Sequence, residues 1–537
     1  MDDMSTADSK STASPPASDE TLDGLLRRAA LRAPERTAII DATGARTSFA
    51  ALDAAASRYA VALRHHFHVR GQAVAVVGEL TPAFAAAYYG ISRSGNVIVL
   101  VNAVLSREAL RHVLATSGAV VTFTSTGLAE PIAALRHELP ALREVVVLDG
   151  ALLPDRLAGI TAEGQENAGG PTWDAADMAC IQFTSGTTGE PKGVRLSHRN
   201  LVVNASQIAA AHGLGEASVA LNNLPTYHPM HLNSAVYATA TQVLYPAEDP
   251  VGAVAAANRY GATHFYSLPV RLARMAADPR LPGLRLETVS AVFSGGSALD
   301  PAAAAVLSEH WGVPVVQGYG LAETSPLTHC DRPERPRPGS VGQVVAGTEC
   351  RIVDVRSRVE LPAGELGEVQ VRGPQVMRGY LGQPESAHLD DEGWFSTGDL
   401  GYQDEEGYLF LVDRLKDVFK CDNWLVAPSE IERVLLSHPR VVDCAVADVP
   451  VPFSGAVAYG EVVLAEDDDG DLAELMDFVN GQVPYYQRLH GLQRTERIPR
   501  SGNGKILRRV VRHRLRERFG QASPSPGRAP AAEGVTR

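Results

Sequence analysis

The chain has 537 residues, of which 45% are hydrophobic and 21% charged, and its 49 basic and 62 acidic residues give a formal charge of −13 at pH 7. This length allows roughly two to four domains and a sizeable core, which excludes small disulfide scaffolds. The composition also excludes a disordered or fibrous protein. Because the charge is acidic, we expect no nucleic-acid partner and no membrane, and a small-molecule ligand becomes the favoured class.

Localisation is predicted from segments that the sequence lacks. No apolar run approaches the ~18 residues of a membrane span, since Glu79 and Arg93 interrupt the best region. Residues 1–20 have neither the basic nor the apolar part of a secretory signal, so we expect a cytoplasmic protein. The five cysteines are scattered without a CxxC pair, which predicts reduced thiols rather than disulfides or a zinc site.

Predicted elements alternate between strands and helices along most of the chain. Residues 1–20 and 521–537 are rich in Ser, Ala and Pro with little to bury, and we expect both tails to be disordered. Between them, β-branched runs alternate with Ala-rich stretches of helical period, which predicts an α/β protein with largely parallel sheets. The first four predicted strands are residues 73–77, 97–101, 119–123 and 145–148.

A strand, a glycine turn and a helix are predicted over residues 289–311. The strand covers residues 289–293, and Ser294, Gly295, Gly296 and Ser297 form the turn. Asp300 can cap the helix and Pro301 suits its first position. Such a unit lets backbone approach a ligand closely.

The pattern changes after about residue 345. Short strands are predicted at residues 350–353, 367–372 and 407–412, which indicates a separate β-rich unit followed by an α+β segment. A final helix is predicted over residues 505–519, with one apolar face formed by Ile506, Leu507, Val510, Val511 and Leu515. Its arginines could bind RNA or membrane, but in so acidic a chain we expect the helix to pack on its own domain.

Residues 183–194, FTSGTTGEPKGV, carry the clearest chemical signal. The glycines let the backbone turn its N–H groups inward, the hydroxyls can bond phosphate oxygens, and a lysine adds a mobile positive charge. The pattern GxxxxGK[ST] cannot be laid on it, so it predicts a phosphate loop other than a Walker A loop. The predicted phosphate ligands are Thr184, Ser185, Gly186, Thr187, Thr188, Gly189 and Lys192.

This loop resembles the first signature of the adenylate-forming superfamily, which includes acyl-CoA synthetases, luciferases and nonribosomal peptide synthetase adenylation domains. Further matching motifs follow in the family's order over most of residues 25–518. They are residues 224–228, 293–299, 317–324, 364–368, 394–399, 413–417 and 499–505. The resemblance implies a large α/β N-terminal domain of mostly parallel sheets with a small β-barrel-like unit, and a small mobile α+β C-terminal domain.

The resemblance also assigns roles, and the chemistry explains the residue types. An acid must be coupled to AMP, with release of pyrophosphate, before it becomes a good electrophile, and charge stabilisation supplies most of that catalysis. Lys505 would reach the acid's oxyanion and the α-phosphate, Glu323 would hold Mg²⁺, and Thr324 would bond the α-phosphate. The remaining residues implied for ATP binding are Gly295, Gly296, Ser297, Gly318, Tyr319, Gly320, Asp399, Arg414 and Lys416.

Two readings of His228 stay open. In the family this position gates the substrate channel, whereas a histidine satisfied inside the core is the structural alternative. For the whole chain, the resemblance implies an N-terminal adenylation domain at residues 21–412, a hinge at 413–414 and a C-terminal lid at 415–520. Rotation at the hinge, where Asp413 lies, would exchange Lys505 for a face that accepts a thiol.

The acceptor of the second step is the least determined part of the prediction. The expected partners are a small acid and CoA, and a homodimer is compatible with the resemblance. However, Asn423 stands where the family has a glycine beside the pantetheine tunnel, and it could crowd the passage of a thiol. The alternatives are a carrier-protein thiol, an amine, or a diazotase-like enzyme that activates nitrite for transfer to an aromatic amine.

The acid itself is predicted to be small, polar or aromatic. Polar side chains occur where the family lines its acyl site, and a lipid tail would leave them without hydrogen bonds. These side chains are His231, Asn233, Ser234, Tyr237, His264 and Tyr266. A catalytically silent nucleotide-binding protein would be expected to lack Lys505, Glu323 or Asp399, and all three are present.

Overall fold

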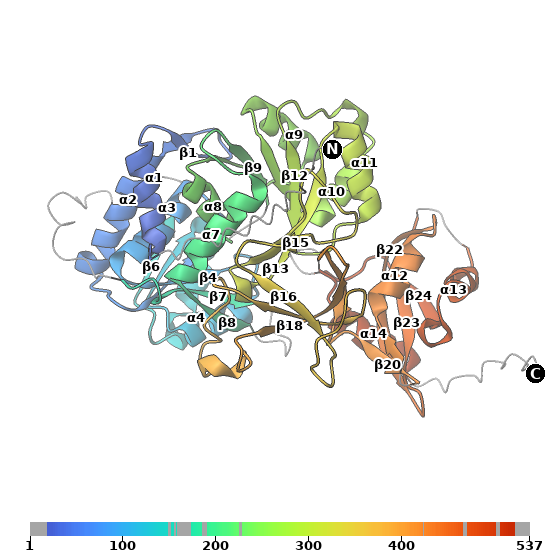
Figure 1. Ribbon diagram of the computed structural model, residues 1–537. Helices are drawn as coiled ribbons and strands as arrows, with labels where there is room; N and C mark the ends of the chain where they lie inside the picture. Colours follow the sequence, from blue (N-terminus) through green and yellow to red (C-terminus); the bar gives the residue numbers. More distant parts are fainter. Residues whose placement is uncertain are drawn as a thin grey trace, which may run out of the picture. The chain divides into compact units, whose positions relative to one another are not determined.

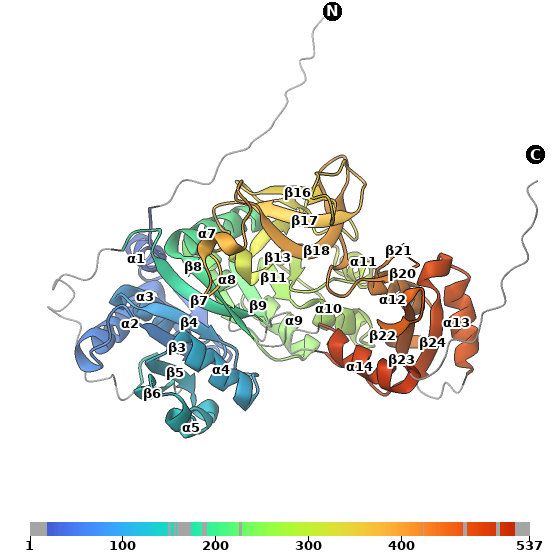
Figure 2. The same cartoon turned by 90° about the horizontal axis from the view of Figure 1, so that it is seen from below.

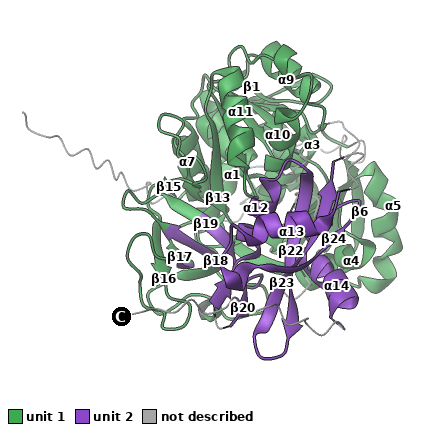
Figure 3. Cartoon of the chain, turned by 90° about the vertical axis from the view of Figure 1, so that its right-hand side faces the viewer, with its two compact units in different colours: residues 1–365, 369–397, 403–410 green, residues 366–368, 398–402, 411–537 purple. Residues whose placement is uncertain are grey.

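The computed structural model describes residues 19–148, 152–154, 157, 173–184, 191–224, 228–422, 424–465, 470–500 and 505–520. The predicted disordered tails therefore fall almost entirely outside the described residues. The chain divides into two compact units (Figure 3). Unit 1 comprises residues 1–365, 369–397 and 403–410, and unit 2 comprises residues 366–368, 398–402 and 411–537. This division falls at Phe410–Leu411, near the predicted hinge.

Unit 1 contains a nine-stranded sheet in the order β15-β14-β13-β12-β11-β9-β10-β1-β2 (Figure 1). The strands from β1 to β13 along this order are parallel, and β2, β14 and β15 are antiparallel to their neighbours. Their bounds are β1 Thr37–Ile40, β2 Arg46–Ser48, β9 Val219–Asn223, β10 Thr241–Leu244, β11 His264–Ser267, β12 Ala291–Gly295, β13 Val315–Gly320, β14 Leu327–Cys330 and β15 Gln343–Val344.

A second, six-stranded sheet has the order β6-β5-β3-β4-β7-β8 (Figure 2). Its strands are parallel except for β8, which pairs antiparallel with β7. The bounds are β3 Ala73–Val77, β4 Val97–Val101, β5 Val121–Ser125, β6 Glu144–Leu148, β7 Met178–Thr184 and β8 Lys192–Ser197. Helices cover both sheets, as parallel sheets with apolar strands require.

The helices of unit 1 begin and end where the sequence places capping residues. Asp300, as predicted, accepts a hydrogen bond from the Ala302 N–H at 3.0 Å and caps α11. Gly95, Gly118 and Gly312 end three helices in the left-handed conformation. The helices are α1 Leu22–Arg32, α2 Phe49–Val61, α3 Pro82–Ser94, α4 Arg107–Ser117, α5 Thr126–Ala134, α7 His198–His212, α8 Met230–Ala238, α9 Pro250–Arg259, α10 Pro269–Ala276 and α11 Pro301–Trp311.

Three predicted strands are displaced by two residues, and one of them is the strand predicted at 407–412, which lies at Leu409–Arg414. The strand predicted at 119–123 lies at Val121–Ser125, because the Ala119 N–H still completes the end of α4 by bonding the Leu114 carbonyl. The strand predicted at 289–293 lies at Ala291–Gly295. Pairing with β11 and β13 therefore takes Ser294 and Gly295, which were predicted to form the turn, into strand β12.

A four-stranded sheet in the order β16-β17-β18-β19 follows, at Glu349–Val353, Gly367–Arg372, Phe395–Gln403 and Leu409–Arg414. Unit 2 has its own sheet, β21-β20-β23-β22 with β24 paired to β23, and a continuous apolar core. Its elements are β20 Phe419–Cys421, β21 Trp424–Val426, α12 Pro428–Leu436, β22 Val441–Val451, β23 Gly455–Leu464, α13 Leu472–Asn480, β24 Leu489–Arg494 and α14 Arg508–Phe519. None of the described helices combines the length and the apolar character needed to cross a membrane.

The last helix differs from its prediction. It begins at Arg508 rather than residue 505, because Ile506 pairs with Arg500 in a β-bridge and the Leu507 N–H bonds the Pro499 carbonyl. Val511 and Leu515 are fully buried, whereas Leu507 and Val510 are 42% and 36% exposed. The apolar face is therefore narrower than predicted, and the helix packs on β22 and β23 as expected.

Candidate active site

The phosphate loop joins two paired strands of the six-stranded sheet. Thr184 ends β7 and stands opposite Lys192, the first residue of β8. The predicted ligands Ser185, Gly186, Thr187, Thr188 and Gly189 lie outside the described residues. Antiparallel pairing thus fixes both ends of the loop, and Lys192 is placed at its C-terminal end.

Lys192 and Glu323, 131 positions apart in the chain, meet through one tyrosine. The Lys192 Nζ lies 5.1 Å from the centre of the Tyr380 ring, a cation–π distance. The Tyr380 hydroxyl donates a hydrogen bond to Glu323 Oε1 at 2.7 Å. Glu323 is only 8% exposed, so this charge-assisted bond is largely shielded from water. The structure therefore joins the predicted phosphate-binding cation to the predicted metal ligand.

Tyr380, which contacts both of these predicted site residues, was not predicted from the sequence. It is held by strand-like pairing with β8, in which Val194 bridges Tyr380 and the Leu381 N–H bonds the Gly193 carbonyl at 2.7 Å. Gly379 has φ +107°, which a side chain would strain. The signal in the sequence was the Arg-Gly-Tyr run at 378–380, which follows a predicted strand and needs a close turn.

His388 borders the same cluster. Its ring lies edge-on to Tyr380 at 4.5 Å between centroids. Burial and the positive charge of Lys192 lower the pKa of His388, while the carboxylate of Glu323 opposes the shift. Burial and Lys192 thus both favour the neutral form of the His388 imidazole.

The two glycine motifs meet at the carboxyl edge of the nine-stranded sheet. Gly295 at the end of β12 pairs with Gly318 on β13, and Gly296 has φ +89°. A Cβ on Gly320 would lie 1.9 Å from the Pro326 carbonyl oxygen, so only glycine fits there. Ser297 is half-buried beside this turn. The sheet thus brings together two predicted adenine-binding motifs that are separated in the sequence.

Tyr319 and Thr324 are more enclosed than their predicted roles suggest. Tyr319 is 8% exposed and its ring lies 5.8 Å from that of His329. Thr324 is fully buried, and its hydroxyl accepts from the Leu321 N–H at 3.0 Å and donates to the Pro326 carbonyl. The Thr324 hydroxyl therefore also holds the turn that follows β13 in place.

His228 lies just before α8, and burial lowers its pKa to about 4. Its Nδ1 accepts a hydrogen bond from the Met230 N–H at 3.3 Å, which leaves the proton of the neutral ring on Nε2. This contact fixes the ring against the start of α8. It is compatible with both readings of this residue.

Several side chains of the predicted polar acid pocket are paired within the protein. Asn233 accepts from the Tyr89 hydroxyl at 2.9 Å and donates to the Tyr88 hydroxyl at 3.0 Å. His264 Nε2 lies 2.9 Å from the His212 carbonyl oxygen. These groups need no partner from a substrate, so they do not support the argument for a polar acid. His231 is different, since its buried Nδ1 has no partner among the described residues.

Unit 2 holds the predicted ribose-binding pair. Asp399 on β18 is 4% exposed, and its Oδ1 lies 3.0 Å from Arg414 Nε at the end of β19. Lys416 follows, and burial with the nearby Arg414 lowers its pKa against the attraction of Asp417. Asp413 accepts from the N–H groups of Arg414 and Ser429, which ties the predicted hinge to the start of α12.

Lys505 is exposed in unit 2 and lies immediately before Ile506, the residue that bridges Arg500. Asn423 lies outside the described residues. Across the described part of the chain, no group of three or more His, Cys, Asp or Glu side chains is arranged to hold a metal ion. A single carboxylate such as that of Glu323 is enough for Mg²⁺ that arrives with a nucleotide, because this ion keeps several waters and binds one or two carboxylates plus phosphates.

The chain matches two family models, "AMP-binding enzyme" over residues 26–381 and "AMP-binding enzyme C-terminal domain" over residues 430–505. It belongs to the AMP-binding enzyme family. A 4-coumarate–CoA ligase of Oryza sativa subsp. japonica is 32% identical over 499 residues, which are 90% of this chain and 92% of that protein. A feruloyl-CoA synthase of an Amycolatopsis species is 32% identical over 495 residues, covering 91% and 98%.

Solved structures agree with the sequence comparisons. ATP-bound MatB from Rhodopseudomonas palustris superposes with a TM-score of 0.85 at 27% identity, covering 93% of this chain and all of that one. The predicted superfamily, α/β fold class and activity as an AMP-forming, ATP-dependent ligase are confirmed. The roles of the individual site residues stay predictions.

Proposed function

We propose that the chain uses ATP and Mg²⁺ to adenylate a small aromatic carboxylic acid and transfers the acyl group to CoA. The observation that carries this proposal is the linked series Lys192, Tyr380 and Glu323. It joins a cation at the end of the phosphate loop to a carboxylate beside the adenine motif. A nucleoside triphosphate with its metal ion needs a cation for the phosphates and a carboxylate for the metal, a short distance apart.

In the first half-reaction, the acid's carboxylate oxygen attacks the α-phosphorus in line and pyrophosphate leaves. Lys192 and the hydroxyl loop would hold the β- and γ-phosphates, and Glu323 would hold the Mg²⁺ that neutralises charge on the phosphates. Tyr380 would orient the Glu323 carboxylate. Lys505 would bridge the acid's oxygen and the α-phosphate, so that charge accumulating in the transition state meets a cation.

The nucleoside part of ATP would be recognised by a carboxylate and by the glycine motifs. Asp399 can accept hydrogen bonds from both ribose hydroxyls, and Arg414 at 3.0 Å orients the carboxylate. Gly296 would let the backbone approach a flat base, because its φ of +89° disfavours a side chain and nothing lies within 4 Å of where a Cβ would stand. Tyr319 would contribute ring surface to adenine.

In the second half-reaction, a thiolate attacks the acyl carbonyl and AMP leaves with the electron pair of the broken C–O bond. The 4-coumarate and ferulate relatives support an aromatic acid and a CoA acceptor.

Five cysteines without a disulfide among them support the cytoplasmic location proposed from the sequence.

The test is pyrophosphate exchange into ATP with Mg²⁺ and without CoA, across aliphatic acids, aryl acids, amino acids and nitrite. We expect aryl acids to drive exchange, and CoA then to give a thioester, AMP and pyrophosphate. Exchange with nitrite and with no carboxylic acid would refute the proposal in favour of a nitrite-activating enzyme. Exchange with a carboxylic acid but no thioester formed from CoA would refute only the proposal that CoA is the acceptor.

A further inference from the structure

Three amide side chains form a buried row along one face of α7. Asn200, Asn204 and Gln207 follow one another at intervals of four and three residues, so the helix places them on the same face. Asn204 is completely buried, and the other two are at most 6% exposed. Apolar residues normally line the buried face of a helix, so the role of this row lies in the hydrogen bonds that it makes.

Asn204 holds the strand that follows Glu323. Its Oδ1 accepts a hydrogen bond from the Leu327 N–H at 3.0 Å, and its Nδ2 donates to the Leu327 carbonyl at 2.9 Å. The same Nδ2 donates to Gln207 Oε1 at 2.8 Å, which fixes the orientation of the amide. One side chain of α7 therefore holds both backbone groups of a residue close to Glu323 in the chain.

Asn200 holds the segment that carries Tyr380. Its Nδ2 donates to the carbonyls of Pro374 and Val376, at 2.7 and 2.9 Å, and its Oδ1 accepts from the Ser197 N–H at the start of α7. Four residues of a helix advance the chain by ~6 Å, so α7 sets the spacing between its two amide contacts. The helix thereby fixes where the two segments lie relative to each other.

The two segments also bond each other directly. The Met377 N–H donates to the Glu323 carbonyl at 2.8 Å, and the Ser325 hydroxyl donates to the Gln375 carbonyl at 2.8 Å. Ser325 has φ +73°, a left-handed conformation that a residue other than glycine keeps only when its surroundings hold it. These contacts bring the Tyr380 hydroxyl to Glu323 Oε1.

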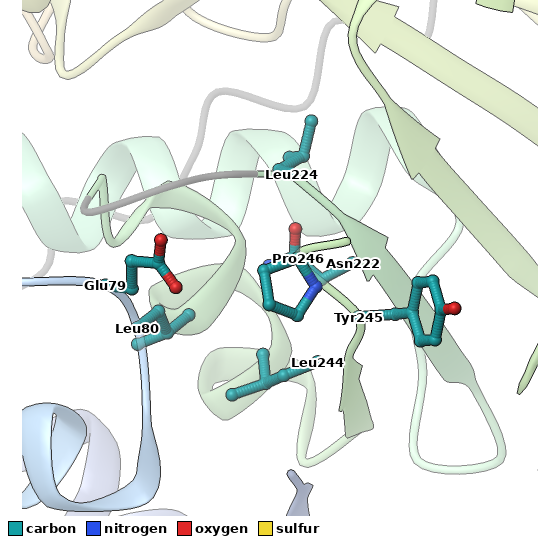
Figure 4. Close-up of a pocket in the computed structure, with 7 residues that line it drawn as sticks. All are labelled: Glu79, Leu80, Asn222, Leu224, Leu244, Tyr245 and Pro246. Atoms are coloured by element: carbon teal, nitrogen blue, oxygen red, sulfur yellow. The ribbon is translucent and has the colours of Figure 1, made fainter. Parts of the chain in front are cut away.

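Buried amides elsewhere in unit 1 do not form such a network. Asn222 lines a small pocket beside β9 and β10 (Figure 4), and its amide atoms, like those of Gln242, have no hydrogen-bond partner among the described residues. The row on α7 differs because its amides bond the backbone of two segments that are distant in the sequence. A polar network that is fully bonded inside a protein favours one arrangement of the chain over others.

We propose that Asn204 and Asn200 are positioning residues for the metal ligand, because they keep Glu323 within hydrogen-bond distance of Tyr380. The inference rests on the proposed function, in which Glu323 holds Mg²⁺, and it names residues that act on this site without touching a substrate. A shift of about 1 Å between the two segments would take the 2.7 Å bond beyond the range of a hydrogen bond. The Glu323 carboxylate would then lose the group that orients it toward the metal.

The test is calorimetric titration of the full chain with ATP, in Mg²⁺ and in EDTA, so that it measures binding and not turnover. Asn204→Ala removes the contacts with Leu327. Ser325→Ala is a milder second variant, which removes only the bond to the Gln375 carbonyl and is used in the same way if Asn204→Ala does not fold.

Asn96→Ala is the matched control. Asn96 is 2% exposed, and its amide accepts from the Gln72 N–H at 3.0 Å and donates to the Val69 carbonyl at 3.1 Å. It precedes β4, whereas the phosphate loop follows the parallel strand β7, so the two lie at opposite edges of the six-stranded sheet. The control variant therefore removes a similar set of hydrogen bonds away from the proposed site.

We expect Asn204→Ala to raise the Kd for ATP in Mg²⁺ about tenfold and to leave the Kd in EDTA unchanged. Asn96→Ala should lower the free energy of unfolding to a similar extent and keep the Mg²⁺ effect of the parent. A merely structural role predicts the same result for both variants. Equal losses of ATP affinity with and without the metal, or no loss, would overturn the proposal.

A double-mutant cycle tests whether Asn204 acts through Tyr380. If it does, the combined variant Asn204→Ala with Tyr380→Phe should lose less Mg²⁺-dependent affinity than the product of the two single losses. Losses that multiply would overturn the inference, and so would ATP binding by the parent that Mg²⁺ does not change. If the Mg²⁺ effect follows the expected pattern but no carboxylic acid drives pyrophosphate exchange, only the proposed function is refuted.

Discussion

Replacing Tyr380 by Phe is the sharpest test of the Lys192–Tyr380–Glu323 series. The substitution keeps the ring that faces Lys192 and removes only the hydroxyl that donates to Glu323 at 2.7 Å. A hydrogen bond to a charged, mostly buried group contributes about 1.5–3 kcal/mol. At 1.4 kcal/mol per factor of ten, the apparent affinity for Mg²⁺ and ATP should fall about 10- to 100-fold.

The assay is pyrophosphate exchange with the acid saturating, titrated separately with Mg²⁺ and with ATP. Tyr408→Phe is the matched control, because the Tyr408 ring also faces an arginine, with its hydroxyl 3.5 Å from the Arg335 carbonyl, outside the proposed site. We expect Tyr408→Phe to behave as the parent. An unchanged Mg²⁺ dependence in Tyr380→Phe would refute the positioning role of the hydroxyl.

Four further predictions concern single residues. Lys505→Ala should abolish exchange while calorimetry still detects ATP binding, and retained exchange would exclude its catalytic role. Asp399→Ala should weaken ATP binding about tenfold or more, and an unaltered Kd would exclude ribose recognition. Arg93→Met should lower the free energy of unfolding, measured in urea, by about 3–5 kcal/mol. The reason is that the Arg93 guanidinium, 3% exposed, pairs with the carboxylates of Asp23 and Asp53. A loss below about 1 kcal/mol would contradict this prediction. Burial lowers the pKa of His329 to about 3, whereas the unfolded chain, with a pKa near 6.5, binds the proton more readily. The free energy of unfolding should therefore fall as pH drops below about 6.5. His329→Phe should flatten this pH dependence in thermal melts, and an unchanged slope would contradict the prediction.

The sequence by itself determined the family, the fold class and the approximate places of eight strands. These follow from local features, such as the β-branched run Val97–Val101, the Asp300–Pro301 helix start and the hydroxyl-rich loop at 183–194. Each depends on residues close together in the chain, where propensity, capping and turn chemistry act. The start of α14 was missed because a distant pairing, that of Ile506 with Arg500, competes with helical propensity.

Only the tertiary structure decided which side chains meet. Tyr380 joins Lys192 to Glu323 because a segment far along the chain pairs with β8, and no spacing in the sequence encodes that contact. The same holds for the buried amides, since Asn222 and Asn223 are adjacent and chemically identical in the sequence. Alternation along β9 turns them to opposite faces of the sheet, where the Asn223 side chain has three hydrogen-bond partners and the Asn222 side chain has none among the described residues.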